Sequence, residues 1–291
     1  MPRHYVSSDE DSARWDGFRF RAGDIVISTR TKHGTTWMQM ICALLVFGTP
    51  DLPGSLAELS PWLDWLVLPA GEVASGLDAQ AHRRFIKTHT PLDGLPLDRR
   101  ATYVVVARNP LDARRSHLHH RRNLDRELMS RLSGQPEVPA PGDVTEHDWL
   151  VEWIDRSCDW WTDLDSLEGV VHHVADAWSR RDEPNVVLVH YDDLSRDLEG
   201  EMRRLASRLD LDVDEATWPA LVDAATLDDM RSRAELVAPG PPGLFREPAR
   251  FFRAGEVGTA RALLGDDEID RYELRLAELA PPDVVAWLDR G

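Results

Sequence analysis

The sequence predicts a single α/β domain built around a parallel, doubly wound sheet. Short apolar runs rich in β-branched residues recur along the chain, and segments with helical periodicity lie between them. The clearest run, 102–107, is apolar throughout, which is typical of a strand that a parallel sheet buries on both faces. No internal repeat and no strong domain boundary divides residues 1–291, so we expect one domain.

The elements follow one another in the order expected of such a fold. Strands are predicted at 24–28, 84–88, 102–107 and 185–190. Helices are predicted from Thr35 or Thr36 to about Phe47 with a threonine as N-cap, from about Leu111, and over 199–209 and 266–279. Residues 1–20 are expected to form an N-terminal extension. The Pro- and Gly-rich segments 133–143 and 238–248 are typical of functional lids or disordered loops.

The charge of the chain excludes two classes of protein. It has 34 Lys plus Arg against 51 Asp plus Glu, a net charge of -17. General nucleic-acid binders and membrane-surface binders need positive fields, so neither class is expected.

Residues 1–14 have no apolar signal region, and the longest apolar run, 40–47, is far shorter than the ~20 residues of a membrane span. We expect a cytoplasmic protein without stable membrane insertion, in which Cys42 and Cys158 are reduced thiols.

Lysine is rare in this chain. Only two of the 34 basic residues are lysines, Lys32 and Lys87, and the others are arginines. Genome composition explains the excess of arginine on solvated surfaces. Lysine remains useful where a compact charge must reach a single oxygen that a planar guanidinium does not fit. The count alone leaves chance and function equally open.

The first candidate site lies where the strand 24–28 meets a helix. A strand, a tight loop and a helix N-terminus bind phosphate, because backbone N–H groups and the helix dipole point at the anion. Gly34 allows close backbone approach, Thr35 and Thr36 add hydroxyl donors, and Lys32 adds a charge. The spacing is not that of a Walker A loop. By spacing alone, an ordinary turn with an exposed lysine is about equally compatible.

This segment resembles the 5′-phosphosulfate-binding loop of the cytosolic-type sulfotransferases, Tyr-Pro-Lys-Ser-Gly-Thr-Thr-Trp, which use 3′-phosphoadenosine 5′-phosphosulfate (PAPS). The residues that match in register are Lys32, Gly34, Thr35, Thr36 and Trp37. His33 replaces the family's Ser, and residues 30–31 replace its Tyr-Pro. The resemblance implies that this loop, His33 included, binds PAPS as co-substrate without a metal. It implies that Lys32 neutralises the bridging and phosphate oxygens, and that Trp37 stacks on the adenine.

The second lysine is next to a candidate base. His89 follows the strand 84–88 at the edge where α/β folds place ligands, and an ordinary histidine pKa of about 6.5 suits general-base work. A surface histidine is the plain alternative, since the chain has 11. Residues 87–91 resemble the sulfotransferase pattern Lys-(Thr/Ser)-His-Leu-Pro. The resemblance implies that His89 removes the proton of the acceptor hydroxyl and that Lys87 stabilises charge on the transferring sulfuryl group.

A third motif follows the strand 102–107. Arg108 and Ser116 are eight residues apart, and a guanidinium and a hydroxyl that meet can hold a phosphate dianion. They fit the family's 3′-phosphate site. The basic run 108–122 is interpreted as a local patch that attracts an anionic cofactor rather than nucleic acid. His117 and His120 have a spacing compatible with metal binding, but no carboxylate or cysteine partner supports a metal site.

The C-terminal third contains three weaker matches. Residues 189–194 resemble the family's Tyr-Glu-Asp-Leu, which implies that Tyr191 contacts the adenine. Leu227 stands where an adenine-packing Phe is usual. Residues 251–258 resemble a closing loop, Phe-x-Arg-Lys-Gly-x-x-Gly, that grips the 3′-phosphate. The retained contacts there are Arg253 and Gly255, whereas Ala254 replaces the Lys and loses one cation. Residues 238–258 are therefore expected to form a mobile loop that closes over the cofactor.

Together these motifs, spread over about 24–258, predict a sulfotransferase. The expected reaction moves the sulfuryl group of PAPS to a hydroxyl of a small-molecule acceptor and releases PAP, with His89, Lys32 and Lys87 as catalytic residues. The acceptor is expected to be a hydrophobic alcohol, phenol or glycolipid, because the paired Trp and Leu of 61–68 suggest an apolar pocket. An ordinary core helix is an equal alternative for that segment. The residues that either line the same pocket or pack inside are Trp149, Trp153, Trp160 and Trp161.

Two other functions stay open at this point. A protein that binds PAP but has lost activity is compatible with Ala254 and with a changed C-terminal motif. A P-loop kinase of a small hydroxyl compound needs Mg²⁺ and a Walker lysine, neither of which is evident. Residues 265–266 replace the Thr-Val of the family's dimerisation stretch, so that dimer is not expected and the oligomeric state is open.

Overall fold

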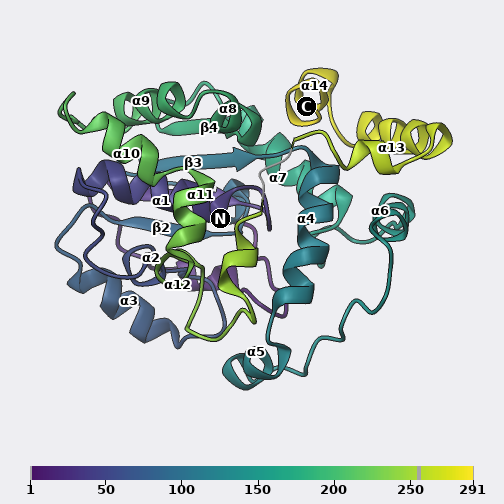
Figure 1. Cartoon of the computed structure of the whole chain (residues 1–291), viewed down its shortest axis with the longest axis horizontal. Helices are drawn as coiled ribbons and strands as arrows, with labels where there is room; N and C mark the ends of the chain where they lie inside the picture. Colours follow the sequence, from purple (N-terminus) through teal and green to yellow (C-terminus); the bar gives the residue numbers. More distant parts are fainter. Residues whose placement is uncertain (1, 254–256, 291) are drawn as a thin grey trace.

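The computed structural model describes residues 2–253 and 257–290, which contain a four-stranded parallel sheet. The strands are β1 (Ile25–Thr29), β2 (Phe85–Thr88), β3 (Thr102–Ala107) and β4 (Val186–His190), in the order β2-β1-β3-β4. Figure 1 shows the strands side by side with helices around them. Because all strands run the same way, their carboxyl ends meet at one edge of the sheet.

Alternate strand residues pack into two hydrophobic cores. On one face Ile27 and Val104 pack against α1 (Thr35–Phe47), α9 (Leu198–Arg208) and α10 (Trp218–Ala224). On the other face Val26 and Val105 pack with residues of α3 (Ala70–Ala79) and α7 (Leu167–Ser179). Helices therefore cover both faces, and the predicted single α/β domain with a doubly wound parallel sheet is confirmed.

The remaining elements surround this sheet. They are η1 (Ser12–Trp15), α2 (Leu56–Leu59), η2 (Leu92–Gly94), α4 (Pro110–Asn123), α5 (Arg126–Ser133), α6 (Glu146–Asp155), α8 (Tyr191–Arg196), α11 (Leu227–Ser232), α12 (Ala234–Val237), η3 (Pro248–Phe251), η4 (Arg261–Leu263), α13 (Asp266–Leu279) and α14 (Pro282–Leu288). A separate apolar cluster joins α6, α7, α13 and α14 beside the sheet. Figure 1 shows α13 and α14, in yellow, at one end of the molecule.

The predicted threonine N-cap of α1 is wrong. The N-cap is Gly34, which has no side chain to accept a hydrogen bond and whose backbone is left-handed, with φ 97°. The segment 61–68 forms turns and isolated bridges, so the core helix, one of its two open alternatives, is ruled out. The long Pro- and Gly-rich segment 238–247 has no helix or strand, as expected.

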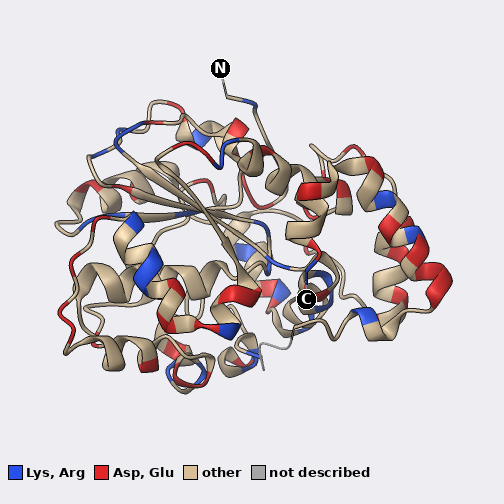
Figure 2. Cartoon of the chain, turned by 90° about the horizontal axis from the view of Figure 1, so that it is seen from above, with Lys and Arg blue, Asp and Glu red and all other residues tan. Residues whose placement is uncertain are grey.

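Acidic residues are spread over the outer helices, with a dense group on α13 (Figure 2). The last turn of α4 is basic instead, with His120, Arg121 and Arg122. Cys42 is a buried thiol and Cys158 a half-buried one. No helix of the described residues combines the length and the apolar character that crossing a membrane requires.

Candidate active site

The loop after β1 has an unusual backbone. Lys32 and Gly34 both lie in the left-handed region, with φ of 67° and 97°. This conformation is uncommon for lysine and costs on the order of 1 kcal/mol, so the surrounding structure must enforce it. A Cβ on Gly34 would lie 3.0 Å from a ring carbon of Tyr191 and 3.5 Å from Val106. The loop therefore needs glycine here, both for its φ and for the close approach of Tyr191.

The side chain of Lys32 is half-buried in front of this loop. Its Nζ lies 3.6 Å from the centroid of the Phe251 ring. Burial, together with the positive charges of Arg108, Lys87 and Arg253, lowers the pKa of Lys32 to about 7. An anion bound here would reverse this shift, because it would replace lost solvation and offset the neighbouring cations.

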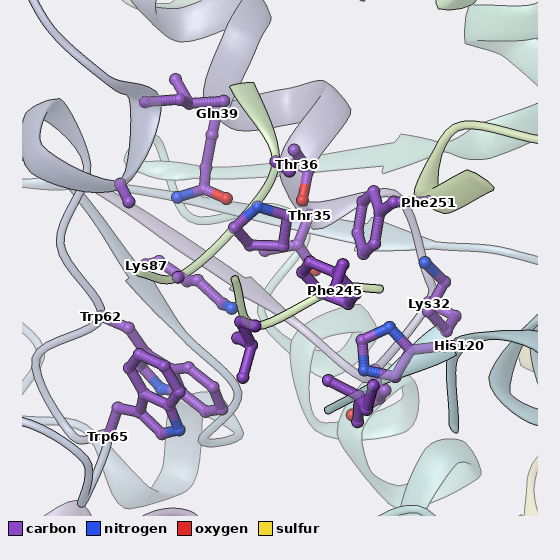
Figure 3. A pocket seen from close by; sticks show the side chains of 18 of the residues that line it. Lys32, Thr35, Thr36, Gln39, Trp62, Trp65, Lys87, His120, Phe245 and Phe251 are labelled. Atoms are coloured by element: carbon purple, nitrogen blue, oxygen red, sulfur yellow. The ribbon is translucent and has the colours of Figure 1, made fainter. Parts of the chain in front are cut away.

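The second lysine reaches the same space from the end of β2. The Nζ of Lys87 lies 3.9 Å from the centroid of the Trp62 ring. Burial lowers the pKa of Lys87 to about 8, although the carboxylates of Asp64 and Glu10 oppose that shift. Figure 3 shows the two lysines on opposite sides of the pocket, Lys87 beside Trp62 and Lys32 beside Phe251.

The imidazole of His89 is buried and has a defined orientation. Its Nδ1 lies 2.6 Å from the backbone carbonyl oxygen of Thr29, so Nδ1 carries the proton that it donates to that oxygen. The Nε2 atom is then the basic nitrogen. Burial and the positive charges of Lys87 and Arg30 hold the pKa of His89 well below its usual value. A neutral imidazole with Nε2 unprotonated has the form that a general base requires.

The predicted 3′-phosphate residues lie around the start of α4. The guanidinium of Arg108, at the end of β3, is 4.2 Å from the centroid of the Tyr191 ring. Ser116 lies two turns along α4, and both residues line one cavity together with Arg253. Ala254 and Gly255, also predicted to contact the cofactor, lie outside the described residues. The arrangement offers two guanidinium groups and a hydroxyl to an anion.

An aromatic corner lies beside these groups. Trp37 meets Tyr191 edge to face, with ring centroids 5.0 Å apart, and its indole N–H donates to the carbonyl oxygen of Ala225 at 2.8 Å. Leu227, the first residue of α11, lines the same cavity. These flat apolar surfaces suit a planar heterocycle.

A cavity of about 1080 Å³ joins nearly all of the predicted site residues. Its lining includes Lys32, Gly34, Thr35, Thr36, Trp37, Lys87, His89, Arg108, Ser116, Tyr191, Leu227 and Arg253. His33 does not line it: the imidazole is buried behind the loop, and its Nδ1 lies 3.0 Å from the carbonyl oxygen of Thr31. The predicted contact of His33 with the cofactor therefore stays a prediction.

One wall of the cavity is aromatic. Trp62 and Trp65 stack with centroids 5.2 Å apart and an interplanar angle of 7°, and Phe245 lies 5.1 Å from Phe251. The resemblance did not single out Phe245. Its signal was a pair of apolar residues, 244–245, inside a Pro- and Gly-rich segment expected to be a lid. None of the other candidate tryptophans lines this cavity: Trp149 and Trp153 are buried elsewhere, and Trp160 and Trp161 lie further out.

The two histidines on α4 have ring centroids 6.2 Å apart and face different aromatic partners. His117 faces Trp149 at 6.3 Å, whereas His120 faces Phe245 at 5.4 Å and Phe251 at 5.8 Å between ring centroids. Over the ranges 2–253 and 257–290, no cluster of three or more His, Cys, Asp or Glu side chains is placed to hold a metal ion.

A buried ionic cluster behind His89 was also missed. Arg30 donates to the backbone carbonyl oxygen of His89 and to carboxylate oxygens of Glu10 at 3.3 Å and Asp165 at 2.8 Å. Arg30 thus ties the loop after β1 to the loop after β2. Its one sequence signal was that it departs from the family motif, which has Tyr at this position.

Comparisons with known sequences agree with this geometry. A sequence model described as the sulfotransferase domain matches residues 22–277. A glycolipid sulfotransferase of Mycobacterium bovis (strain BCG / Pasteur 1173P2) is 41% identical over 308 residues, covering 99% of this chain and 94% of the relative. Sulfotransferase 1B1 of Mus musculus is 26% identical over 255 residues, covering 84% of this chain and 78% of the relative.

Solved structures share the fold. A mouse sulfotransferase complexed with PAP superposes with a TM-score of 0.70 at 20% identity, covering 95% of this chain and 90% of that chain. Retinol dehydratase in a complex with retinol and PAP gives a TM-score of 0.68 at 20% identity, covering 96% of this chain and 86% of that chain. Given the extent of the domain match and the identity to the mycobacterial relative, the chain belongs to the sulfotransferase family.

Proposed function

We propose that this sulfotransferase moves the sulfuryl group of PAPS to a hydroxyl group of a glycolipid and releases PAP. The observation that carries the proposal is the meeting of two lysines and a neutral, oriented histidine in one cavity. The relative from Mycobacterium bovis, named a glycolipid sulfotransferase, supports the acceptor class.

The cofactor half of the cavity fits PAPS in its charge and shape. Lys32 and the N-terminus of α1 offer positive charge and N–H donors to the 5′ end, and Thr35 and Thr36 add hydroxyls. Arg108 and Ser116 suit the 3′-phosphate. The corner of Trp37, Tyr191 and Leu227 suits the adenine. Gly34 leaves room where a Cβ would meet Tyr191.

The chemistry follows from the protonation states of the side chains. The Nε2 atom of His89 accepts the proton of the acceptor hydroxyl while that oxygen forms its bond to sulfur and the bond from sulfur to the PAP oxygen breaks. Lys87 holds a positive charge beside the transferring group, and Lys32 holds one beside the oxygen that leaves. Positioned charges of this kind act more strongly when the groups are shielded from water, and the side chains of Lys87 and His89 are both buried.

The acceptor half of the cavity is suited to an amphiphile. The stacked indoles of Trp62 and Trp65 and the rings of Phe245 and Phe251 supply an apolar wall. Ser8, Asp9 and Ser130 also line the cavity and offer polar groups to a sugar. An acceptor with an apolar body and a hydroxylated head group matches both surfaces.

The test is transfer of labelled sulfate from PAPS to a panel of glycolipids, alcohols and phenols. Wild-type protein should sulfate a glycolipid with a higher kcat/KM than simple alcohols or phenols. His89→Ala should lower kcat by about 10²–10⁴-fold, the usual contribution of proton transfer, while the affinity for PAP changes little. His82→Ala, which changes a histidine outside this cavity, is the matched control and should keep wild-type turnover.

Other results would contradict the proposal in recognisable ways. Tight PAP binding with no turnover on any acceptor would indicate a binding protein without activity. ATP binding that depends on Mg²⁺, together with phosphate transfer, would indicate a kinase. Full activity of His89→Ala would show that the base is assigned to the wrong residue.

A further inference from the structure

A buried carboxylate from outside the recognised motifs lies behind the proposed base. Asp64 is 0% exposed. Its Oδ2 accepts hydrogen bonds from the hydroxyls of Thr88 and Thr90, the latter at 2.7 Å, and from the indole N–H of Trp15 at 3.0 Å. Thr88 and Thr90 are the residues directly before and after His89. One carboxylate oxygen therefore holds the chain on both sides of the base.

The segment that contains Asp64 also runs along the end of β2. The backbone N–H of Lys87 donates to the carbonyl oxygen of Pro61 at 2.9 Å, and Trp62 forms a parallel bridge with Lys87. The Trp62 ring lies 3.9 Å from the Lys87 Nζ and meets the His89 ring edge to face at 4.6 Å. Figure 3 shows Trp62 next to Lys87 and stacked on Trp65. The segment 61–64 thus contacts Lys87 and His89 and also supplies Trp62, part of the wall of the acceptor pocket.

The charge of Asp64 acts on Lys87. Burial lowers the pKa of Lys87, and Asp64 is the largest opposing influence, ahead of Glu10 and Asp9. The ionisable groups that interact with Lys87 are Asp64, Glu10, Asp9, Lys32, His89 and His120. When ionised, the three acidic groups favour the ammonium form, and burial raises the pKa of each of them, that of Glu10 to about 8. The cations and any protonated imidazole oppose the ammonium form. Removing the charge of Asp64 should therefore make Lys87 lose its proton at a lower pH.

We propose that Asp64 is a positioning residue for sulfuryl transfer: one of its carboxylate oxygens fixes His89 through Thr88 and Thr90, beside the acceptor wall. This inference rests on the proposed function for its effect on turnover. Asp64 touches neither reactant and acts through the residues that do. Small displacements of a base cost much rate, about 10²-fold for a misplacement of ~1 Å.

Two variants separate the positioning effect from the charge effect. Thr90→Val removes one donor and leaves the carboxylate charged, so kcat should fall by about tenfold while the pKa of Lys87 stays near its wild-type value. Asp64→Asn keeps the size of the side chain but removes its charge. Its kcat should fall by about 10²-fold, and the alkaline limb of the kcat–pH profile should move to lower pH. Binding of PAP should stay near the wild-type affinity in both.

The sequence makes the charge effect measurable without turnover. The chain has two lysines, so lysine labelled with ¹³C at Cε gives two resonances, and Lys87→Arg assigns them. Asp64→Asn should lower the pKa read from the Lys87 resonance and shift that of Lys32 much less. An unchanged Lys87 titration in this variant would overturn the charge effect, whether or not the protein transfers sulfate.

Trp15→Phe provides the matched structural control. It removes the third hydrogen bond to the same oxygen, but Trp15 lies in η1, away from the loop that carries His89. This variant should lower Tm and keep the wild-type kcat. Equal losses of kcat in Thr90→Val and Trp15→Phe at equal losses of Tm would show that the role of Asp64 is structural. A wild-type protein with no sulfate transfer would contradict the proposed function instead.

Discussion

The two halves of the cavity are built in different ways. The cofactor half consists of strand ends and helix starts, where residues 32–37 supply a loop and the first turn of α1. The acceptor half consists of the irregular segments 61–68 and 238–247 and the short helix η3, which bring together aromatic rings from distant parts of the chain. A phosphate needs N–H groups and charges at fixed positions, so its site is a short continuous motif. An apolar acceptor needs volume and contact, which many residue combinations supply.

We expect the cofactor half to tolerate changes of the backbone less well than the acceptor half does. Gly34→Ala places a Cβ 3.0 Å from Tyr191 at a φ of 97°, which costs about 1–2 kcal/mol. If relief of that strain displaces the loop, the affinity for PAP should fall by about 30-fold, the equivalent of ~2 kcal/mol. Isothermal titration calorimetry with PAP measures this change directly.

Gly48→Ala is the control for backbone strain alone. Gly48 ends α1 with a φ of 64°, and no atom lies within 4 Å of the position of its Cβ. This variant should lower Tm in a similar way but bind PAP with the wild-type affinity. Equal losses of PAP affinity in the two glycine variants would mean that the loop after β1 is not distinguished from any other left-handed turn.

Substitutions in the acceptor half should change the KM for the acceptor and leave the affinity for PAP unchanged. Trp65→Leu removes one member of the stacked pair and keeps an apolar side chain, and such aromatic pairs contribute about 0.5–1.5 kcal/mol. The KM for the best glycolipid should rise by about tenfold, whereas the Kd for PAP should not change. Trp161→Leu changes a tryptophan that is 45% exposed and outside the cavity, and it should alter neither constant. A changed PAP affinity in Trp65→Leu would show that the two halves of the cavity do not bind their ligands independently.

The regular elements were predictable because their signals are local. The strand 102–107 and the helix 266–279 have the predicted bounds, since one is apolar throughout and the other amphipathic along its length. The N-cap of α1 was predicted wrongly because threonine is a common cap, whereas here Gly34 takes a left-handed conformation beside Tyr191. That choice depends on a contact between residues more than 150 positions apart, which a local pattern does not contain.

In the candidate site too, local motifs were predictable and contacts between distant residues were not. The sequence indicated Lys32, His89 and Arg108, because each lies at the end of a strand within a recognisable motif, and the structure brings them to one cavity. It did not indicate Asp64 or the contacts of Arg30. Their partners are 20 to 135 positions away in sequence, and a buried carboxylate or guanidinium gains a role only through such contacts.

The smallest expected effect is the pH dependence of PAP binding to the cofactor half. Lys32 has a pKa of about 7, so above that pH the unliganded protein has largely lost the charge that a phosphosulfate requires. Binding of PAP should then take up a proton, and the affinity should fall as pH rises, by about fivefold between pH 7 and pH 8. Calorimetry in buffers with different ionisation enthalpies measures both quantities.

Two methionine variants assign that proton to one lysine. Lys32→Met should bind PAP more weakly and remove the proton uptake, because no group with the required pKa remains beside the 5′ end. Lys87→Met should keep most of the uptake, since Lys87 faces Trp62 on the acceptor side and has a pKa of about 8. If only Lys87→Met lost the proton uptake, the negative charge of the bound PAP would lie nearer to the acceptor wall than to the loop after β1. Lys87 would then belong to the cofactor half of the cavity.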